Sequence, residues 1–104
     1  MTTIFACHQG KERSVVLAGL YRAAGRDVES FEGGIERMIT LSEDELGQEI
    51  GQEDDVVLIC ESWGPRDPQL RAVQTAEELL SGIGRRYSRG TSRELMKAIV
   101  FRKK

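Results

Sequence analysis

The stretch FACHQGKERSVVLAG, residues 5–19, joins an apolar run to an apolar helical pattern through a polar turn that begins with a cysteine. Residues 3–6 predict a short strand. Residues 14–24 predict a helix, because their apolar side chains recur at helical spacing. These apolar positions are Val16, Leu17, Leu20 and Ala24. A strand that passes at once into a helix is the first unit of an α/β fold.

The chain then repeats this alternation of strands and helices. Strands are predicted at residues 28–31 and 56–60, and the second run is continuously apolar, as in a strand buried on both faces. Helices are predicted at residues 42–50, after a capping box, and at residues 68–83, where Pro68 suits the first turn. The order of elements therefore indicates a mainly parallel sheet.

Two segments fit either a strand or a helix. Residues 35–41 are ambiguous and fit a further short strand. Residues 92–101 follow a second capping signal, formed by Thr91 and Glu94, and show helical spacing. The run AIVF at residues 98–101 is also typical of a strand, so the sequence leaves this segment open.

Length and composition predict one α/β domain over residues 1–104. The expected fold is a three-layer sandwich in which helices flank a small, mainly parallel sheet of about three or four strands. A net charge of −2 with 31% charged residues is an ordinary soluble composition. No apolar run is long enough to span a membrane, and the start has no signal pattern. Two cysteines form no disulfide framework, which indicates a cytoplasmic protein.

The polar turn is expected to bind an anion. It follows the carboxyl end of a strand and opens a helix, where free N–H groups and the helix dipole favour negative charge. Gly10 permits a tight turn with positive φ, and Arg13 offers a planar fork to two phosphate oxygens. Cys7 in this setting is expected to be a thiolate, and Ser14 can donate a hydrogen bond to its sulfur.

On Cys7, Gly10, Arg13 and Ser14, which match the signature C-x-x-G-x-x-R-[ST], the chain resembles the cysteine-dependent protein tyrosine phosphatases. The spelling GKER is most similar to dual-specificity members. The position after the first strand is similar to low-molecular-weight tyrosine phosphatases and the related arsenate reductases, which usually read C-x-G-N-x-x-R-S. The resemblance covers residues 3–24 well and the rest of the chain in outline.

The resemblance implies a single phosphatase-like domain that hydrolyses phosphomonoesters through a phosphocysteine intermediate. The implied substrate is phosphotyrosine or a similar phosphoester on a protein or small molecule, with no metal or other cofactor. Cys7 would be the nucleophile, Arg13 would hold phosphate oxygens, and Ser14 would stabilise the sulfur. The implied phosphate-binding residues are His8, Gln9, Gly10, Lys11, Glu12 and Arg13.

A general acid is also needed to protonate the leaving oxygen. Asp67, in the stretch ESWGPRDPQL, resembles the Asp-Pro acid loop of the low-molecular-weight and arsenate reductase group. Asp67 also fits a simple helix cap, and Glu12 and then Glu61 are the alternative acids. In that group the loop follows the last strand, so the resemblance implies that this chain lacks one strand–helix unit.

Two other functions stay open from the sequence. Arsenate reductases use a second cysteine to resolve an intermediate, and Cys60 stands in the corresponding region, although it also fits a buried core residue. A catalytically silent phosphate-binding module is the other alternative. With His8 as the single histidine, the cysteine and histidine spacing does not suit a zinc site.

Basic residues gather at the end of the chain. Eight of the 15 lysines and arginines lie in residues 85–104, against one of the 17 acidic residues. A basic segment can bind nucleic acid, which makes a nucleic-acid partner a weak alternative. The simpler interpretation is a solvated helix face that balances an acidic body. No membrane partner is expected.

Overall fold

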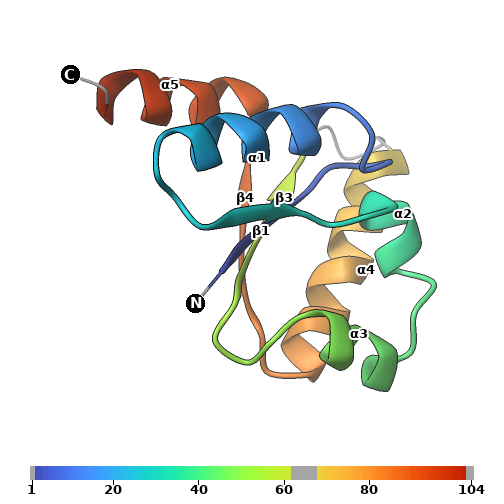
Figure 1. Ribbon diagram of the computed structural model, residues 1–104. Helices are drawn as coiled ribbons and strands as arrows, with labels where there is room; N and C mark the ends of the chain where they lie inside the picture. Colours follow the sequence, from blue (N-terminus) through green and yellow to red (C-terminus); the bar gives the residue numbers. More distant parts are fainter. Residues whose placement is uncertain (1, 62–67, 103–104) are drawn as a thin grey trace.

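The computed structural model describes residues 2–61 and 68–102, with side chains through residue 99, and it contains a four-stranded, all-parallel sheet (Figure 1). The strands are β1 (Thr3–Ala6), β2 (Val28–Ser30), β3 (Asp55–Ile59) and β4 (Arg86–Gly90). Their order across the sheet is β2-β1-β3-β4. The chain thus leaves β1 toward β2 and later crosses to β3 on the other side. The carboxyl ends of β1 and β3 form the switch point where such sheets bind ligands.

Helices cover both faces of the sheet, which confirms the predicted three-layer α/β sandwich (Figure 1). One face carries α1 (Arg13–Ala23) and α5 (Ser92–Arg102). The other face carries α2 (Gly34–Met38), α3 (Glu43–Glu49) and α4 (Pro68–Gly82). Among the described residues, no helix is long and apolar enough to cross a membrane.

Each face of the sheet has its own apolar core. Ala6, Val56 and Leu58 face α2, α3 and α4, whereas Phe5 and Ile59 face α1 and α5. This alternation follows from the period of two along a strand. On the face that carries α1 and α5, the rings of Phe5 and Tyr21 meet edge to face with centroids 5.0 Å apart. The hydroxyl of Tyr21 donates to the carbonyl of Leu95 at 2.9 Å, which ties α1 to α5.

The buried face of α1 differs from the predicted one. Its buried residues are Ser14, Leu17, Ala18 and Tyr21. Val16 is 56% exposed, and Ala24 is exposed just past the last helical residue. The buried residues have helical spacing, but Ser14 is polar and Tyr21 is amphipathic. A prediction from apolar residues alone therefore chose Val16 instead of Ser14 for the buried face.

Residues 35–41 form no strand, which corrects that expectation. Gly33, at φ +81°, precedes a short helix, and the residues after it bury Ile35 and Met38 on one side. A separation of three residues suits a helix, whereas two strand residues three apart would face opposite sides. The ambiguous segment 92–101 is also helical, because it lies within α5.

The fourth strand was missed by the sequence interpretation. Its sequence, RYSRG, is mostly polar and exposed, so no apolar alternation marks it. It pairs in parallel with β3, from Asp55 opposite Arg86 to Ile59 opposite Gly90. A strand and a helix therefore follow the Asp-Pro segment in the chain, so this segment precedes the last strand, whereas in the resembled group the acid loop follows it.

Capping residues begin two of the helices. Before α3, Ser42 accepts from the amide of Glu45 at 3.2 Å, and the carboxylate of Glu45 accepts from the amide of Ser42 at 3.0 Å. This confirms the first predicted capping box. Before α5, the hydroxyl of Thr91 accepts from the amide of Glu94 at 3.1 Å and donates to its carboxylate at 3.1 Å. These contacts fix where each helix starts.

Candidate active site

The candidate site is the turn between β1 and α1, at the switch point of the sheet. Residues 7–12 form this turn, and Arg13 is the first residue of α1. Cys7 follows the central strand β1 directly and is only 3% exposed. The chain thus presents its cysteine where the carboxyl end of a strand meets the start of a helix, as the sequence predicts.

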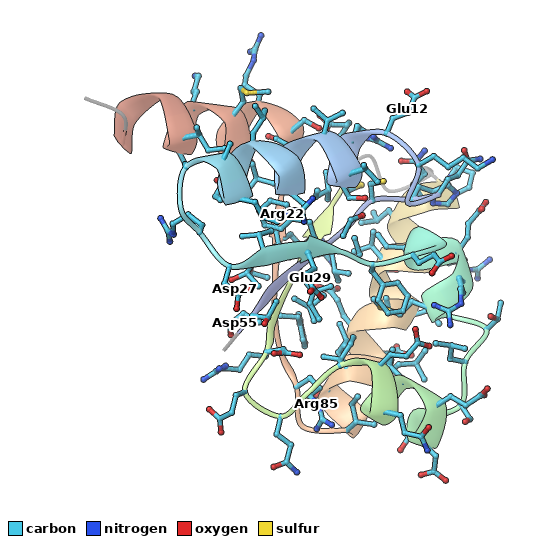
Figure 2. All side chains as sticks on the ribbon, viewed as in Figure 1. Glu12, Arg22, Asp27, Glu29, Asp55 and Arg85 are labelled. Atoms are coloured by element: carbon cyan, nitrogen blue, oxygen red, sulfur yellow. The ribbon has the colours of Figure 1, made fainter. Side chains whose placement is uncertain are left out.

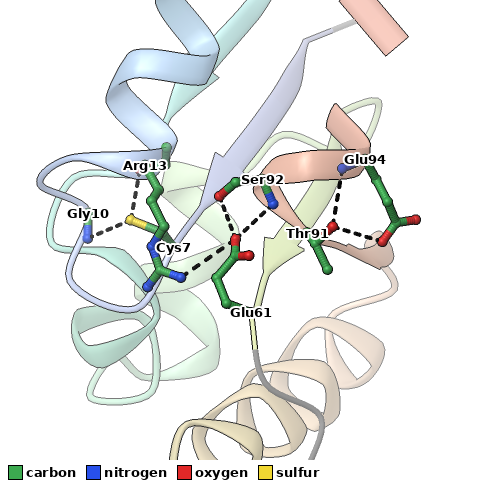
Figure 3. A network of polar contacts seen from close by, with 8 residues as sticks. Cys7, Gly10, Arg13, Glu61, Thr91, Ser92 and Glu94 are labelled. Carbon is green, nitrogen blue, oxygen red and sulfur yellow. Dashed lines mark hydrogen bonds and ion pairs between the residues drawn. The ribbon is translucent and has the colours of Figure 1, made fainter. Parts of the chain in front are cut away.

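Hydrogen bonds surround the sulfur of Cys7. The amide of Gly10 donates to Sγ at 3.2 Å (Figure 3). Oγ of Ser14 also lies 3.2 Å from Sγ. The backbone amide of Ser14 is a further partner of the sulfur. Donors that converge on one atom stabilise negative charge on that atom.

The pKa of Cys7 lies below the ordinary thiol value. Burial acts to raise this pKa, but the hydrogen bonds from Ser14 and Gly10 and the positive charge of Arg13 together outweigh it. The thiolate is the nucleophilic form of cysteine. The geometry therefore favours the reactive form at a lower pH than for a free thiol.

Ser30 is a site residue that the sequence interpretation missed. Its hydroxyl lies 2.7 Å from Oγ of the fully buried Ser14. When Cys7 is a thiolate, Ser14 must donate to the sulfur, and Ser30 can then donate to Ser14. The available signal was the period of two in β2, because Val28 packs toward α1 and Ser30 shares its face.

The turn rests on the start of α2 through its backbone. The amide of Ile35 donates to the carbonyl of Cys7 at 2.8 Å, and the amide of Glu36 donates to the carbonyl of His8 at 3.0 Å. Gly10 adopts φ +68°, and a Cβ built on it would lie 2.5 Å from the nitrogen of Gly34. The close approach of the turn accounts for the glycine at position 34, the first residue of α2.

Arg13 lies beside the sulfur. Its side chain descends from the start of α1 past Cys7, and its guanidinium turns toward Glu61 (Figure 3). The distance from Nη1 of Arg13 to Oε1 of Glu61 is 3.7 Å, and about a third of the Arg13 side chain is exposed. Arg13 is thus held at the mouth of the turn.

A pocket of about 330 Å³ opens over the turn. It is lined by Cys7, His8, Gln9, Lys11, Glu12, Arg13 and Gln69. The structure therefore brings together the predicted phosphate-binding residues around the sulfur, with Gly10 beneath them as a hydrogen-bond donor. Gln69, from the first turn of α4, was not anticipated.

Glu12 and His8 differ in how they sit at this pocket. The side chain of Glu12 is exposed and projects outward from the start of α1 (Figure 2), which lessens its repulsion of a bound anion. Nε2 of His8 lies 3.2 Å from the carboxylate of Glu36. Its Nδ1 is buried and has no hydrogen-bond partner among the described residues.

The structure describes Glu61 and Glu12 of the three candidate general acids. Asp67 lies outside the described residues. The pKa of Glu61 is lowered: burial acts to raise it, but hydrogen bonds from Ser92 and the positive charge of Arg13 outweigh this. An ionised carboxylate held by donors is a poor proton donor, which leaves Asp67 and Glu12 as candidate acids.

Cys60 packs away from Cys7. It belongs to the core between the sheet and α2, α3 and α4, whereas Cys7 belongs to the core on the side of α1 and α5. Both cysteines are buried. Within residues 2–61 and 68–102, no three side chains of histidine, cysteine, aspartate or glutamate are grouped to hold a metal ion.

Several arginines of the basic segment are engaged within the protein. Arg85 donates to the carbonyls of Gly47, Ile50 and Ile83. Figure 2 shows it beside α3, far from the turn at Glu12. Arg86 pairs with Asp55 at 2.7 Å, and Arg89 pairs with Glu77 at 2.5 Å. These pairs favour the simpler interpretation, in which the basic segment balances an acidic body.

Comparison of the chain with protein-family models, with curated proteins and with solved structures gives no match to any of them. The fold and the site therefore define a class by geometry alone. The chain is a parallel α/β sandwich with a cysteine-centred turn at its switch point.

Proposed function

We propose that this protein is a phosphomonoester hydrolase in which Cys7 is the nucleophile. The observation that carries the proposal is the environment of the Cys7 sulfur. The sulfur accepts a hydrogen bond from the amide of Gly10, lies 3.2 Å from Oγ of Ser14, and stands beside Arg13. A nucleophile with a lowered pKa inside a ring of donors suits attack on an anionic phosphoester.

In the first step, the thiolate of Cys7 attacks phosphorus. A P–S bond forms while the P–O bond to the leaving group breaks, and the leaving oxygen takes a proton from a general acid. Asp67 or Glu12 supplies that proton. Arg13 and the amides of the turn hold the equatorial oxygens, on which charge is spread.

In the second step, water attacks phosphorus in the phosphocysteine. The same carboxylate, now ionised, accepts a proton from the water as the P–S bond breaks. Ser14 donates a hydrogen bond to the departing sulfur of Cys7, and Ser30 supports Ser14 in that orientation. Inorganic phosphate leaves, and the thiolate is restored.

The proposed substrate is phosphotyrosine or a similar phosphoester, on a protein or a small molecule. This chemistry uses no metal or other cofactor. We place the protein in the cytoplasm, since a low-pKa thiol needs a reducing compartment to stay active.

A catalytically silent phosphate-binding module is the second candidate. It is favoured by Glu12, which projects outward, and by Glu61, whose lowered pKa makes it a poor acid. Arsenate reduction is less well supported, because Cys60 packs on the opposite face of the sheet from Cys7.

The experiment that tests the proposal measures hydrolysis of a chromogenic aryl phosphate. We expect turnover by the wild type, inhibition by orthovanadate, and no turnover by Cys7→Ser, because a serine hydroxyl is not ionised at neutral pH. The control is phosphate binding by Cys7→Ser, which should persist. Phosphate binding without any turnover by the wild type would favour the silent module.

A further inference from the structure

Glu61 connects the candidate anion site to the start of α5. It lies two residues after the end of β3. Its Oε1 faces Nη1 of Arg13 at 3.7 Å and accepts from the amide of Ser92 at 2.7 Å (Figure 3). The hydroxyl of Ser92 donates to the same oxygen. One carboxylate oxygen thus joins the first residues of two helices.

We infer that Glu61, anchored by Ser92, is a positioning residue that holds Arg13 over the cysteine turn, so that the first turn of α5 is part of the oxyanion site. The inference rests on the proposed function, in which that turn binds the phosphoryl group. It assigns Glu61 a role other than the proton donor for which the sequence offered it.

The contacts of Glu61 suit positioning. Two donors from Ser92 fix the carboxylate before any ligand arrives. The 3.7 Å separation from Arg13 is an ion-pair distance beyond hydrogen-bond length, so it orients the guanidinium without saturating its five N–H donors. Those donors can then serve two oxygens of a phosphoryl group. Positioning before binding lowers the entropy lost on binding.

A purely structural role predicts a different outcome. The side chains of Arg13 and Glu61 are 34% and 40% exposed, and exposed ion pairs contribute little to stability. Removal of Glu61 should therefore change oxyanion affinity much more than thermal stability. If Glu61 were instead the general acid, the loss of hydrolysis rate caused by its removal would depend on the leaving group. Phosphate binding would stay unchanged.

The test is a double-mutant cycle read out by calorimetric binding of inorganic phosphate. The variants are Glu61→Ala, Arg13→Ala and the double variant, each beside the wild type. We expect Glu61→Ala to weaken phosphate binding by about 10-fold, which lies within the range of coupling energies between contacting residues. In the Arg13→Ala background the same change should have little effect, because nothing is left to position.

The matched control is Glu94→Ala. Like Glu61→Ala it removes one carboxylate, in this case from the first turn of α5. Glu94 contacts Thr91, and the structure shows no contact of it with Arg13 (Figure 3). We expect phosphate affinity to stay within about 2-fold of wild type for this variant. Glu61→Gln keeps an acceptor for Ser92 but loses the charge, and should fall between wild type and Glu61→Ala.

The outcomes separate this inference from the proposed function. Normal phosphate affinity in Glu61→Ala, or equal losses with and without Arg13, would overturn the positioning role while leaving the proposed function standing. A wild type that neither binds phosphate nor hydrolyses an aryl phosphate would overturn both. An unfolded Glu61→Ala, detected by thermal melting, transfers the test to Glu61→Gln and to Ser92→Ala.

Discussion

Gly10 and Gly34 pack backbone against backbone: a Cβ on Gly10 would lie 2.5 Å from the nitrogen of Gly34, and a Cβ on Gly34 would overlap the nitrogen of Gly10. Real Cβ atoms do not approach backbone this closely. The two glycines therefore allow the cysteine turn to rest on the start of α2, whose amides hold the carbonyls of Cys7 and His8.

Gly34→Ala should lower stability and oxyanion binding together. Gly34 adopts φ +66°, so alanine there adds backbone strain to overpacking against the turn. We expect a loss of about 2–5 kcal/mol in unfolding free energy from these two causes. Chemical denaturation and phosphate binding measure the two effects.

Gly25→Ala is the control for this change. Gly25 has a similar φ of +85°, but a Cβ there would meet no atom within 4 Å. It should cost about 1–2 kcal/mol from backbone strain alone. Phosphate affinity should stay at the wild-type value. Equal effects of the two substitutions would show that the contact between Gly10 and Gly34 does not support the turn.

Ser14→Ala should move the reactivity of Cys7 to higher pH. Ser14 lowers the pKa of Cys7 through its hydroxyl and its amide, and alanine removes the hydroxyl. The midpoint of alkylation by iodoacetamide against pH should therefore rise, since the thiolate is the form that reacts. Cys60→Ser as the background removes the second thiol from the measurement.

Ser30→Ala should raise the same midpoint by less. Ser30 contacts Ser14, so it acts on the sulfur only through the orientation of that hydroxyl. If alkylation of Ser14→Ala depended on pH as in the wild type, this would contradict the conclusion that Ser14 lowers the pKa of Cys7. A larger shift for Ser30→Ala than for Ser14→Ala would contradict the proposed order of donation.

Cys60→Ser should leave hydrolysis of an aryl phosphate within about 2-fold of wild type. Cys60 packs against α2, α3 and α4, away from the face where Cys7 lies. The expected cost is a modest loss of stability from a hydroxyl placed in an apolar core. Lost activity together with dependence on a reductant would favour the arsenate reductase alternative.

Asp67→Asn tests the general acid. General acids contribute about 10²–10⁴-fold, so phenyl or alkyl phosphates should lose most of their hydrolysis rate. Esters whose leaving group departs without protonation should lose little. Arg13→Lys should instead slow all substrates together, because lysine cannot hold two oxygens in one plane.

Glu12→Gln is the companion to this test. A leaving-group-dependent loss confined to Glu12→Gln would move the acid role from Asp67 to Glu12. Uniform, mild losses in both variants would leave the chain without an acid and would favour the silent binding module.

Much of the fold follows from local patterns in the sequence. The strand at residues 3–6 and the strand β3 have the apolar runs that the structure then buries, and the helix after the cysteine turn forms as predicted but buries Ser14 instead of Val16. The position of Cys7 at the switch point follows from this order of elements. The strand β4 was missed because its exposed, polar sequence has no period of two.

The site could be predicted only where its residues are adjacent in sequence. Cys7, Gly10 and Ser14 lie close together in the sequence, in the cysteine turn and the start of α1, so their meeting at the sulfur follows from local geometry. Ser30 and Gly34 reach the site through the packing of β2 and α2; the period of two in β2 predicts the face of Ser30 but not its contact with Ser14. Long-range contacts of this kind depend on how elements pack rather than on spacing along the chain.

The central claim is tested most directly by trapping the covalent intermediate. Wild-type protein is mixed with an aryl phosphate, quenched in acid within one turnover, and digested for mass spectrometry. The proposed mechanism predicts a phosphoryl group on the peptide that contains Cys7, with more of it in Asp67→Asn if Asp67 is also the base of the second step. Turnover without any phosphoryl group on Cys7, and with activity retained by Cys7→Ser, would contradict it.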